Sequence, residues 1–210
     1  QNTAGIDLQQ ISSHVLPAVV GITDENANII ASGVIISPRG YVVTTWHSIS
    51  SLTKLNVQVR TTAGVSTYLA DVVRIQPEHD LVLLKMKSVD RFLYMAVPPN
   101  NEQLWSDQVA SFGMGVSGQI VNKTGTMGSL PVTLNVDKFQ INEMLTTSSV
   151  YSWEQTGGPL VDARAQLVGI NLAIKNNQNV IEGYAIPSKF IYLHFKEWLP
   201  GTALTKKKIQ

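Results

Sequence analysis

The chain has 210 residues, a length that fits one domain in one or two lobes. Hydrophobic residues make up 44% and charged residues 15%, which excludes a largely disordered chain. Sixteen basic and fifteen acidic residues leave a net charge of +1, so nucleic acid is not an expected partner. The sequence has no cysteine, which excludes disulfides, thiol nucleophiles and cysteine-based zinc sites.

The sequence opens at Gln1 with a polar stretch. No apolar run approaches the roughly 18 residues that cross a bilayer. We therefore expect no signal peptide and no membrane-spanning helix within these 210 residues. We interpret the chain as a mature or excised domain, with any membrane segments lying outside this sequence.

In chain order, the first predicted element is a short helix at residues 6–15, where apolar side chains recur on one face. Short β-rich runs, broken by Gly, Pro, Asn and Asp, then follow in two series. The first series comprises residues 18–22, 33–36, 41–45, 56–60, 68–75 and 81–86. The second comprises residues 108–113, 118–124, 132–134, 138–145, 159–161, 166–174 and 180–186.

The two series predict an all-β fold: a double antiparallel β-barrel with a short N-terminal helix and a C-terminal helix. We expect one domain over residues 1–210, with the first barrel at about 18–88 and the second at about 107–186. A linker at about 89–106 contains two adjacent prolines. Residues 187–210 hold the C-terminal helix and a tail whose lysines at 206–208 are expected to be solvated.

Three segments carry residues suited to nucleophilic catalysis. His47 follows one predicted strand, Asp80 precedes a continuous apolar run, and Thr156 stands before two glycines. Histidine, aspartate and then a hydroxyl residue is the chain order of chymotrypsin-type enzymes. A hydroxyl nucleophile needs a neighbouring base, and the base needs a carboxylate that fixes its tautomer.

The sequence resembles the HtrA-type trypsin-like proteases over nearly its whole length. The resemblance implies a chymotrypsin/trypsin-like double barrel in which His47, Asp80 and Thr156 hold the triad positions and Glu154 an oxyanion-hole position. The segments that carry it are residues 32–37, 40–44, 47, 80–81, 157–160, 169–171 and 184–187.

Two departures from the family pattern predict an inactive triad, and hence a pseudoprotease. Thr156 replaces the usual serine, and its branched side chain restricts the direction of the hydroxyl. Glu154 replaces the usual glycine, so its carboxylate would oppose the negative charge that develops in the transition state. The loss of one oxyanion donor lowers the rate about 10²–10³-fold. Because Ser152 and Trp153 also depart from the family pattern, we expect a rebuilt loop.

The other histidines raise the question of a metal site. His14 is expected to face solvent, whereas His79 precedes the triad aspartate and His194 lies in the C-terminal helix. In the trypsin-like fold that helix packs against the first barrel, so the resemblance brings His194 toward His79. Imidazole is the best ligand for late first-row metals in a chain without cysteine. We therefore expect His79 and His194 to bind a divalent transition metal weakly, such as iron, manganese or nickel; the alternative is two unrelated histidines.

Within the family, the likeness to a degenerate magnetosome branch implies a role in iron (magnetite) biomineralisation. It also implies a position on the lumenal or periplasmic side of the magnetosome membrane, reached through segments outside this sequence. The expected partners are metal ions and a partner magnetosome protease. Two alternatives remain open: an active protease using Thr156 with His47 and Asp80, and a regulator that binds a partner protease without metal.

Overall fold

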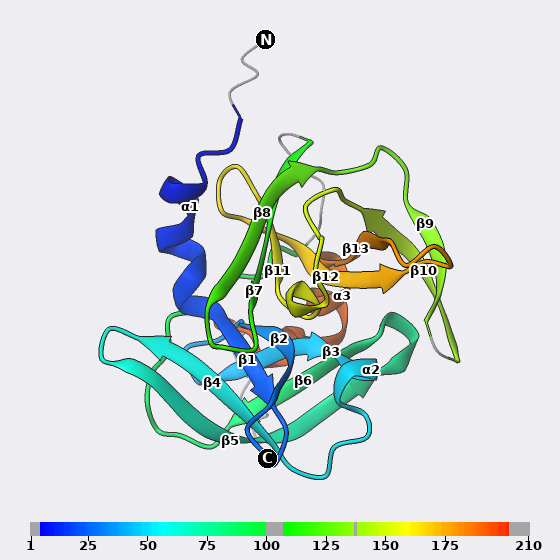
Figure 1. Cartoon of the computed structure of the whole chain (residues 1–210). Coiled ribbons are helices and arrows are strands. Elements are labelled where there is room, and N and C mark those ends of the chain that lie inside the picture. Colours follow the sequence, from blue (N-terminus) through cyan, green and yellow to red (C-terminus); the bar gives the residue numbers. More distant parts are fainter. Residues whose placement is uncertain (1–4, 100–106, 137, 202–210) are drawn as a thin grey trace, which may run out of the picture.

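The computed structural model describes residues 5–99, 107–136 and 138–201, and Figure 1 shows two β-rich halves packed together. The helices are α1 (Leu8–Val15), α2 (Trp46–Ile49) and α3 (Ser188–Phe195), with 3-10 turns η1 (Leu16–Ala18), η2 (Pro77–His79), η3 (Trp153–Gln155) and η4 (Lys196–Trp198). The strands of the first half are β1 (Val19–Thr23), β2 (Ile29–Ile35), β3 (Tyr41–Thr45), β4 (Leu55–Thr61), β5 (Gly64–Gln76) and β6 (Leu81–Met86). Those of the second half are β7 (Gln108–Met114), β8 (Ile120–Thr126), β9 (Val132–Val136), β10 (Phe139–Thr146), β11 (Pro159–Asp162), β12 (Leu167–Lys175) and β13 (Ile181–Pro187).

The first half is a closed antiparallel barrel with the strand order β1-β2-β3-β6-β5-β4. β6 lies between β3 and β5, and its residues Leu81 to Leu84 are fully buried. This burial explains why β6 is a continuous apolar run rather than an alternating one. The barrel core belongs to one apolar cluster that also includes Phe112 and Ile170 of the second half.

The second half is an antiparallel sheet with the order β8-β7-β11-β12-β13-β10-β9. The trypsin-like fold class is thus confirmed, but this sheet is open within the described residues: its end strands β8 and β9 do not pair. β10 is irregular as well: it pairs with β13 at two positions, and its pairing with β9 has a register shift between Ile141 and Met144. Glu143, inside that irregularity, has a positive φ of 61°.

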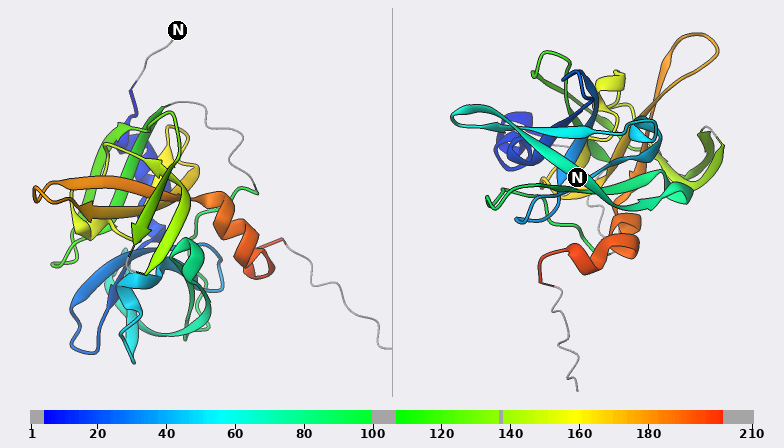
Figure 2. Two further views of the ribbon diagram at one scale, coloured as in Figure 1. Left: turned by 90° about the vertical axis from the view of Figure 1, so that its right-hand side faces the viewer. Right: turned by 90° about the horizontal axis from the view of Figure 1, so that it is seen from below.

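The helices α1 and α3 lie on different sides of the molecule, as the blue and orange-red ribbons of Figure 2 show. α1 starts at Leu8, later than predicted, because the Asp7 side chain accepts hydrogen bonds from the amides of Gln9 and Gln10. α3 starts after Pro187 and gives way to η4 at Lys196, so the predicted C-terminal helix is shorter and in two parts.

Parts of the predicted linker (100–106) and the lysine tail (206–208) lie outside the described residues, and the linker residues up to 99 form no helix or strand. No helix in the described ranges combines the length and apolar character needed to cross a membrane.

Hydrogen bonds also join the two halves beside Thr156. The amide of Ser32 donates to the Thr156 carbonyl (2.9 Å), and the Ser32 hydroxyl donates to the Glu154 carbonyl (2.6 Å). Gly157 follows with φ of +88°, and a Cβ at this position would lie 2.1 Å from the Ser32 carbonyl oxygen. Only glycine fits here, because both the backbone conformation and the space exclude a side chain.

We predict that Gly157→Ala destabilises the fold by about 2–5 kcal/mol, combining left-handed strain with overpacking against fixed backbone. The matched control is Gly118→Ala, which has φ of +77° but no atom within 4 Å of the new Cβ, and should lose only the strain contribution of about 1–2 kcal/mol. Urea unfolding of both variants measures the difference. Equal stability of the two variants would contradict the predicted clash.

Candidate active site and histidine pair

A histidine–aspartate couple lies between β3 and β6. Asp80 Oδ1 accepts the backbone amide of His47 (2.7 Å), and Asp80 Oδ2 contacts His47 Nδ1. The Asp80 carbonyl accepts the amide of Trp46 (2.9 Å). Asp80 thus bonds to the first two residues of α2. Asp80 is 2% exposed, whereas the His47 side chain is 32% exposed and faces the cleft. The structure therefore brings the predicted base and orienting carboxylate together.

Thr156 lies at the end of η3, but its hydroxyl is engaged elsewhere. Thr156 Oγ1 accepts the backbone amide of Ala173 in β12 at 3.0 Å. Among the described residues, no hydrogen bond joins Thr156 to His47, and Thr156 is only 6% exposed. The hydroxyl oxygen thus accepts a bond from the backbone of β12, and its bond to the predicted base is not formed among the described residues.

The amides at the oxyanion-hole positions are also occupied. The amide of Glu154 donates to Ser152 Oγ (3.2 Å), and that of Thr156 donates to the Trp153 carbonyl (2.9 Å). An oxyanion hole needs such donors free and aimed at the developing charge. The Glu154 carboxylate accepts the amide of Val116 at 2.8 Å and the hydroxyl of Ser152 at 3.3 Å. In this conformation both amides donate to partners within the loop.

Gln155, which sequence reasoning missed, holds this loop closed. It is fully buried, and its Oε1 accepts the amides of Tyr151 (2.8 Å) and Ser152 (3.1 Å). Its Nε2 donates to the Ser149 carbonyl (3.0 Å). The only hint in the sequence was a capping-box pattern, Ser152 followed three residues later by Gln155, which the structure confirms as a cap of η3.

The second candidate site is a pair of imidazoles between η2 and α3. His79 Nδ1 and His194 Nε2 lie 2.8 Å apart, although the residues are 115 positions apart in the chain. The His79 ring stacks on Phe190, with ring centroids 3.8 Å apart. His14, by contrast, is exposed on α1, as expected.

Both imidazoles favour the neutral form. Burial lowers the pKa of His79 below its usual 6.5, and the neighbouring His194 charge lowers it further. Burial also lowers the pKa of His194. Neutral imidazole is the form that binds metal. Within the described ranges, no group of three or more His, Asp or Glu residues could hold a metal ion.

Comparison with known proteins places this geometry in a family. Residues 31–170 match the trypsin-like peptidase domain. The probable membrane transporter protein MamO of Paramagnetospirillum magneticum is 40% identical over 199 residues, 94% of this chain and 31% of that protein. The chain therefore spans about a third of the length of this curated relative.

Two solved structures are similar as well. The apo MamO protease domain from Magnetospirillum magneticum has a TM-score of 0.82 and 42% identity, covering 86% of this chain and 97% of that chain. The HtrA-type protease AlgW, with a bound tripeptide, has a TM-score of 0.75 over 88% of this chain and 60% of that chain. At 24% identity, AlgW supports the fold alone.

We predict that Asp80→Ala destabilises the fold by about 2–4 kcal/mol, because it leaves the amide of His47 without its acceptor. Asp80→Asn should cost only about 1 kcal/mol, since an amide oxygen still accepts that bond and asparagine tolerates the left-handed φ of 52°. Thermal and urea unfolding of the two variants measure the difference. An Asn variant as unstable as the Ala variant would mean that the backbone bond to His47 is not the stabilising one.

Proposed function

Because this chain belongs to the family of HtrA-type trypsin-like peptidase domains, we propose that it is a pseudoprotease that binds divalent transition metals in iron biomineralisation. The observation that carries the proposal is the pair of neutral imidazoles, His79 and His194, with ring nitrogens 2.8 Å apart. The magnetosome setting, at the lumenal or periplasmic side of its membrane, rests on the similarity to MamO. The activity of the longer protein, including any membrane attachment, is part of this proposal.

The separation of the two nitrogens fits a shared ion. Metal–imidazole bonds are about 2.0–2.1 Å long, so two such bonds at a right angle place their nitrogens about 2.9 Å apart. In the metal-free pair one ring donates its hydrogen to the other. To bind a metal together, both nitrogens must present lone pairs, so that hydrogen must move to the other nitrogen of its ring. Two protein ligands leave coordination positions for water, which makes the site weak and exchangeable.

The loss of proteolysis is supported by three independent features of the cleft. The Thr156 hydroxyl is bonded to Ala173 rather than to His47, and the amides of Glu154 and Thr156 are bonded inside η3. Each feature counts against one requirement for acyl transfer: a nucleophile hydrogen-bonded to its base, or free donors that stabilise the oxyanion.

One observation favours a second candidate function, a protease using Thr156. The His47–Asp80 couple is intact and His47 remains accessible, so the base is available. Activity would require the Thr156 hydroxyl to leave Ala173 and η3 to open. A third candidate, a regulator that binds a partner protease, requires no metal and would bind its partner equally well in a chelator.

We predict no hydrolysis of casein or of a peptide library by this chain, and none by Thr156→Ser. A serine hydroxyl restores the nucleophile but leaves both oxyanion amides bonded within η3. Product release is measured by mass spectrometry, with an HtrA-type protease as the positive control. Turnover that disappears in Thr156→Ala would establish the protease alternative.

We predict weak binding of Ni²⁺, used as an air-stable probe, that is lost in His79→Ala and in His194→Ala. Protons compete for the same nitrogens, so binding persists above the lowered pKa values of the pair and disappears as the pH falls through them. The loss should therefore begin below pH 6.5. Isothermal calorimetry at several pH values measures both effects.

His14→Ala is the matched control for metal binding, because His14 is exposed and belongs to neither site. Circular dichroism of each variant verifies folding. Unchanged Ni²⁺ affinity in both His79→Ala and His194→Ala, or equal loss in His14→Ala, would rule out the paired site.

A further inference from the structure

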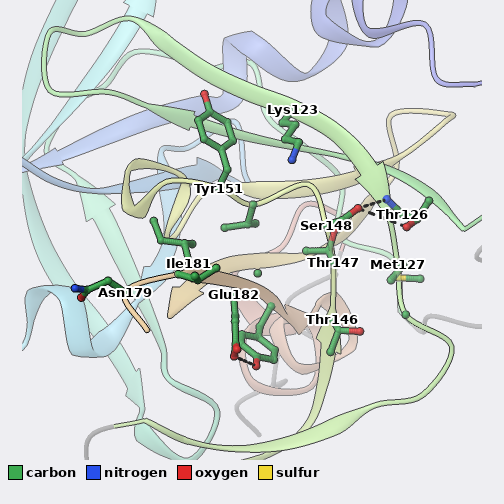
Figure 3. A pocket seen from close by; sticks show the side chains of 15 residues that line it. Lys123, Thr126, Met127, Thr146, Thr147, Ser148, Tyr151, Asn179, Ile181 and Glu182 are labelled. Carbon is green, nitrogen blue, oxygen red and sulfur yellow. Dashed lines mark hydrogen bonds between the residues drawn. The ribbon is translucent and has the colours of Figure 1, made fainter. Parts of the chain in front are cut away.

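The second sheet has two end strands, and within the described residues the chain covers only one of them. At β8, the Thr126 amide donates to Ser148 Oγ (3.0 Å), as Figure 3 shows, and the Ser148 amide donates to the Thr126 carbonyl (3.0 Å). At the other end of the sheet, β9 pairs with β10 and with no other described strand. β9 and β10 lie at the right-hand margin of Figure 1. One edge of β9 is therefore open within the described part of the chain.

The open edge presents the main-chain groups of Thr133 and Asn135. Val136 and Phe139 are the facing residues nearest the turn of the β9–β10 hairpin, with two residues between them. In such a hairpin this pair exchanges both of its main-chain hydrogen bonds, and the bonded pairs then alternate along the strands. Val136 and Leu134 therefore direct their main-chain groups toward β10, whereas Thr133 and Asn135 direct theirs outward. Among the described residues, no main-chain hydrogen bond beyond the hairpin involves Thr133 or Asn135.

The sequence of β9 is nearly symmetric about Leu134. It reads Val-Thr-Leu-Asn-Val, with apolar residues at its ends and centre and short polar residues between them. A second copy running antiparallel about a two-fold axis at Leu134 would place Val132 opposite Val136 and Thr133 opposite Asn135. Each pair of Thr133 with Asn135 would then form two main-chain hydrogen bonds, so all the outward groups of β9 would be satisfied.

This register is favoured over its neighbours. With the axis at Thr133, Asn135 would face Pro131, which has no amide to donate. With the axis at Asn135, Thr133 would face the hairpin turn beyond Val136 instead of a strand residue. An axis between two residues would set an outward residue of one copy against an inward residue of the other. The axis at Leu134 alone uses both outward residues of each copy.

The side chains also permit pairing of β9 with itself. No residue of β9 is charged, so the paired strands would carry no like charges opposite each other. The two copies of Lys138 would lie at opposite ends of the paired strands, roughly 20 Å or more apart and beyond the Debye length. Thr133 Oγ1 donates to Asn142 Oδ1 (3.0 Å), which leaves its lone pairs for an asparagine of the second copy.

We propose that the open edge of β9 is a self-association surface, which binds the same edge of a second copy of this chain. The second sheets of the two copies would join into one sheet about the two-fold axis at Leu134. Each copy contributes a strand of 5 residues, which is far smaller than a standard stable interface. We therefore expect a weak dimer with a Kd of about 0.1–1 mM. This surface is independent of the proposed metal binding and of any proteolysis.

The first test measures self-association by sedimentation velocity in EDTA, which prevents metal ions from bridging two chains. Samples of the whole chain span about 10 µM to about 1 mM, around the expected Kd. Asn135→Pro should weaken the dimer about tenfold or more, because it removes one outward amide from each copy. It spares the pairing with β10, and proline is accepted on edge strands. Asn135→Ala is the matched control, because it keeps the amide and should change the Kd about threefold or less.

A second test establishes the register, and the absence of cysteine from the sequence makes single-cysteine variants specific. In oxidised glutathione, Leu134→Cys should form a disulfide-linked dimer about tenfold faster than Thr133→Cys, because only residue 134 faces its own copy across the axis. Val116→Cys measures the rate of random collision, since Val116 is 60% exposed between β7 and β8, at the other end of the sheet. Circular dichroism verifies the folding of each variant.

Three results would overturn the proposal: a monomer at every concentration, equal Kd values for Asn135→Pro and Asn135→Ala, or cross-linking of Leu134→Cys at the rate of Val116→Cys. Loss or retention of Ni²⁺ binding in the histidine variants leaves these measurements unchanged, so the two proposals fail separately.

Discussion

The buried carboxylate of Asp80 is the constraint on which both sites depend. A buried carboxylate must be matched by donors, and Asp80 receives the amide and the Nδ1 of His47. To reach them, its backbone takes the left-handed conformation at the end of η2. Because of that turn, two consecutive residues contact different helices. Asp80 bonds to α2, whereas His79 contacts His194 and Phe190 of α3. One short turn therefore serves the cleft and the histidine pair together.

Under the proposed function, the His47–Asp80 couple is retained while the loop around η3 departs from the family pattern. The couple of His47 and Asp80 also fixes α2 on the first barrel, so it has a structural role that does not depend on catalysis. The loop around η3 is joined to the first barrel through Ser32, which bonds to the carbonyls of Glu154 and Thr156, while Gln155 accepts amides from within the loop. A protein that no longer cleaves substrates would retain the couple for stability while the loop changed freely.

The sequence predicted the regular elements well and the loop contacts poorly. β3 and β6 have the predicted bounds, because turn residues and a change in burial mark both ends of each strand. The triad positions and Glu154 followed from the family pattern, and the proximity of His79 and His194 from the family fold. The bond from Ala173 to Thr156 and the role of Gln155 could not be predicted, since they depend on side chains meeting irregular backbone. The open second sheet could not be predicted either, because whether the end strands β8 and β9 pair depends on contacts between segments far apart in the sequence.

The Ser32 hydroxyl, which joins the two halves, has a consequence for the order of folding. It accepts the amide of Met114 (2.7 Å) and donates to the carbonyl of Glu154, 122 residues away in the chain. Contacts of such long sequence separation carry a large loop-closure entropy and form late. The β4–β5 and β12–β13 hairpins, in contrast, close locally. The loop around Glu154 is thus expected to order last, after both sheets have formed. The final arrangement of the residues beside Thr156 would then form at the end of folding.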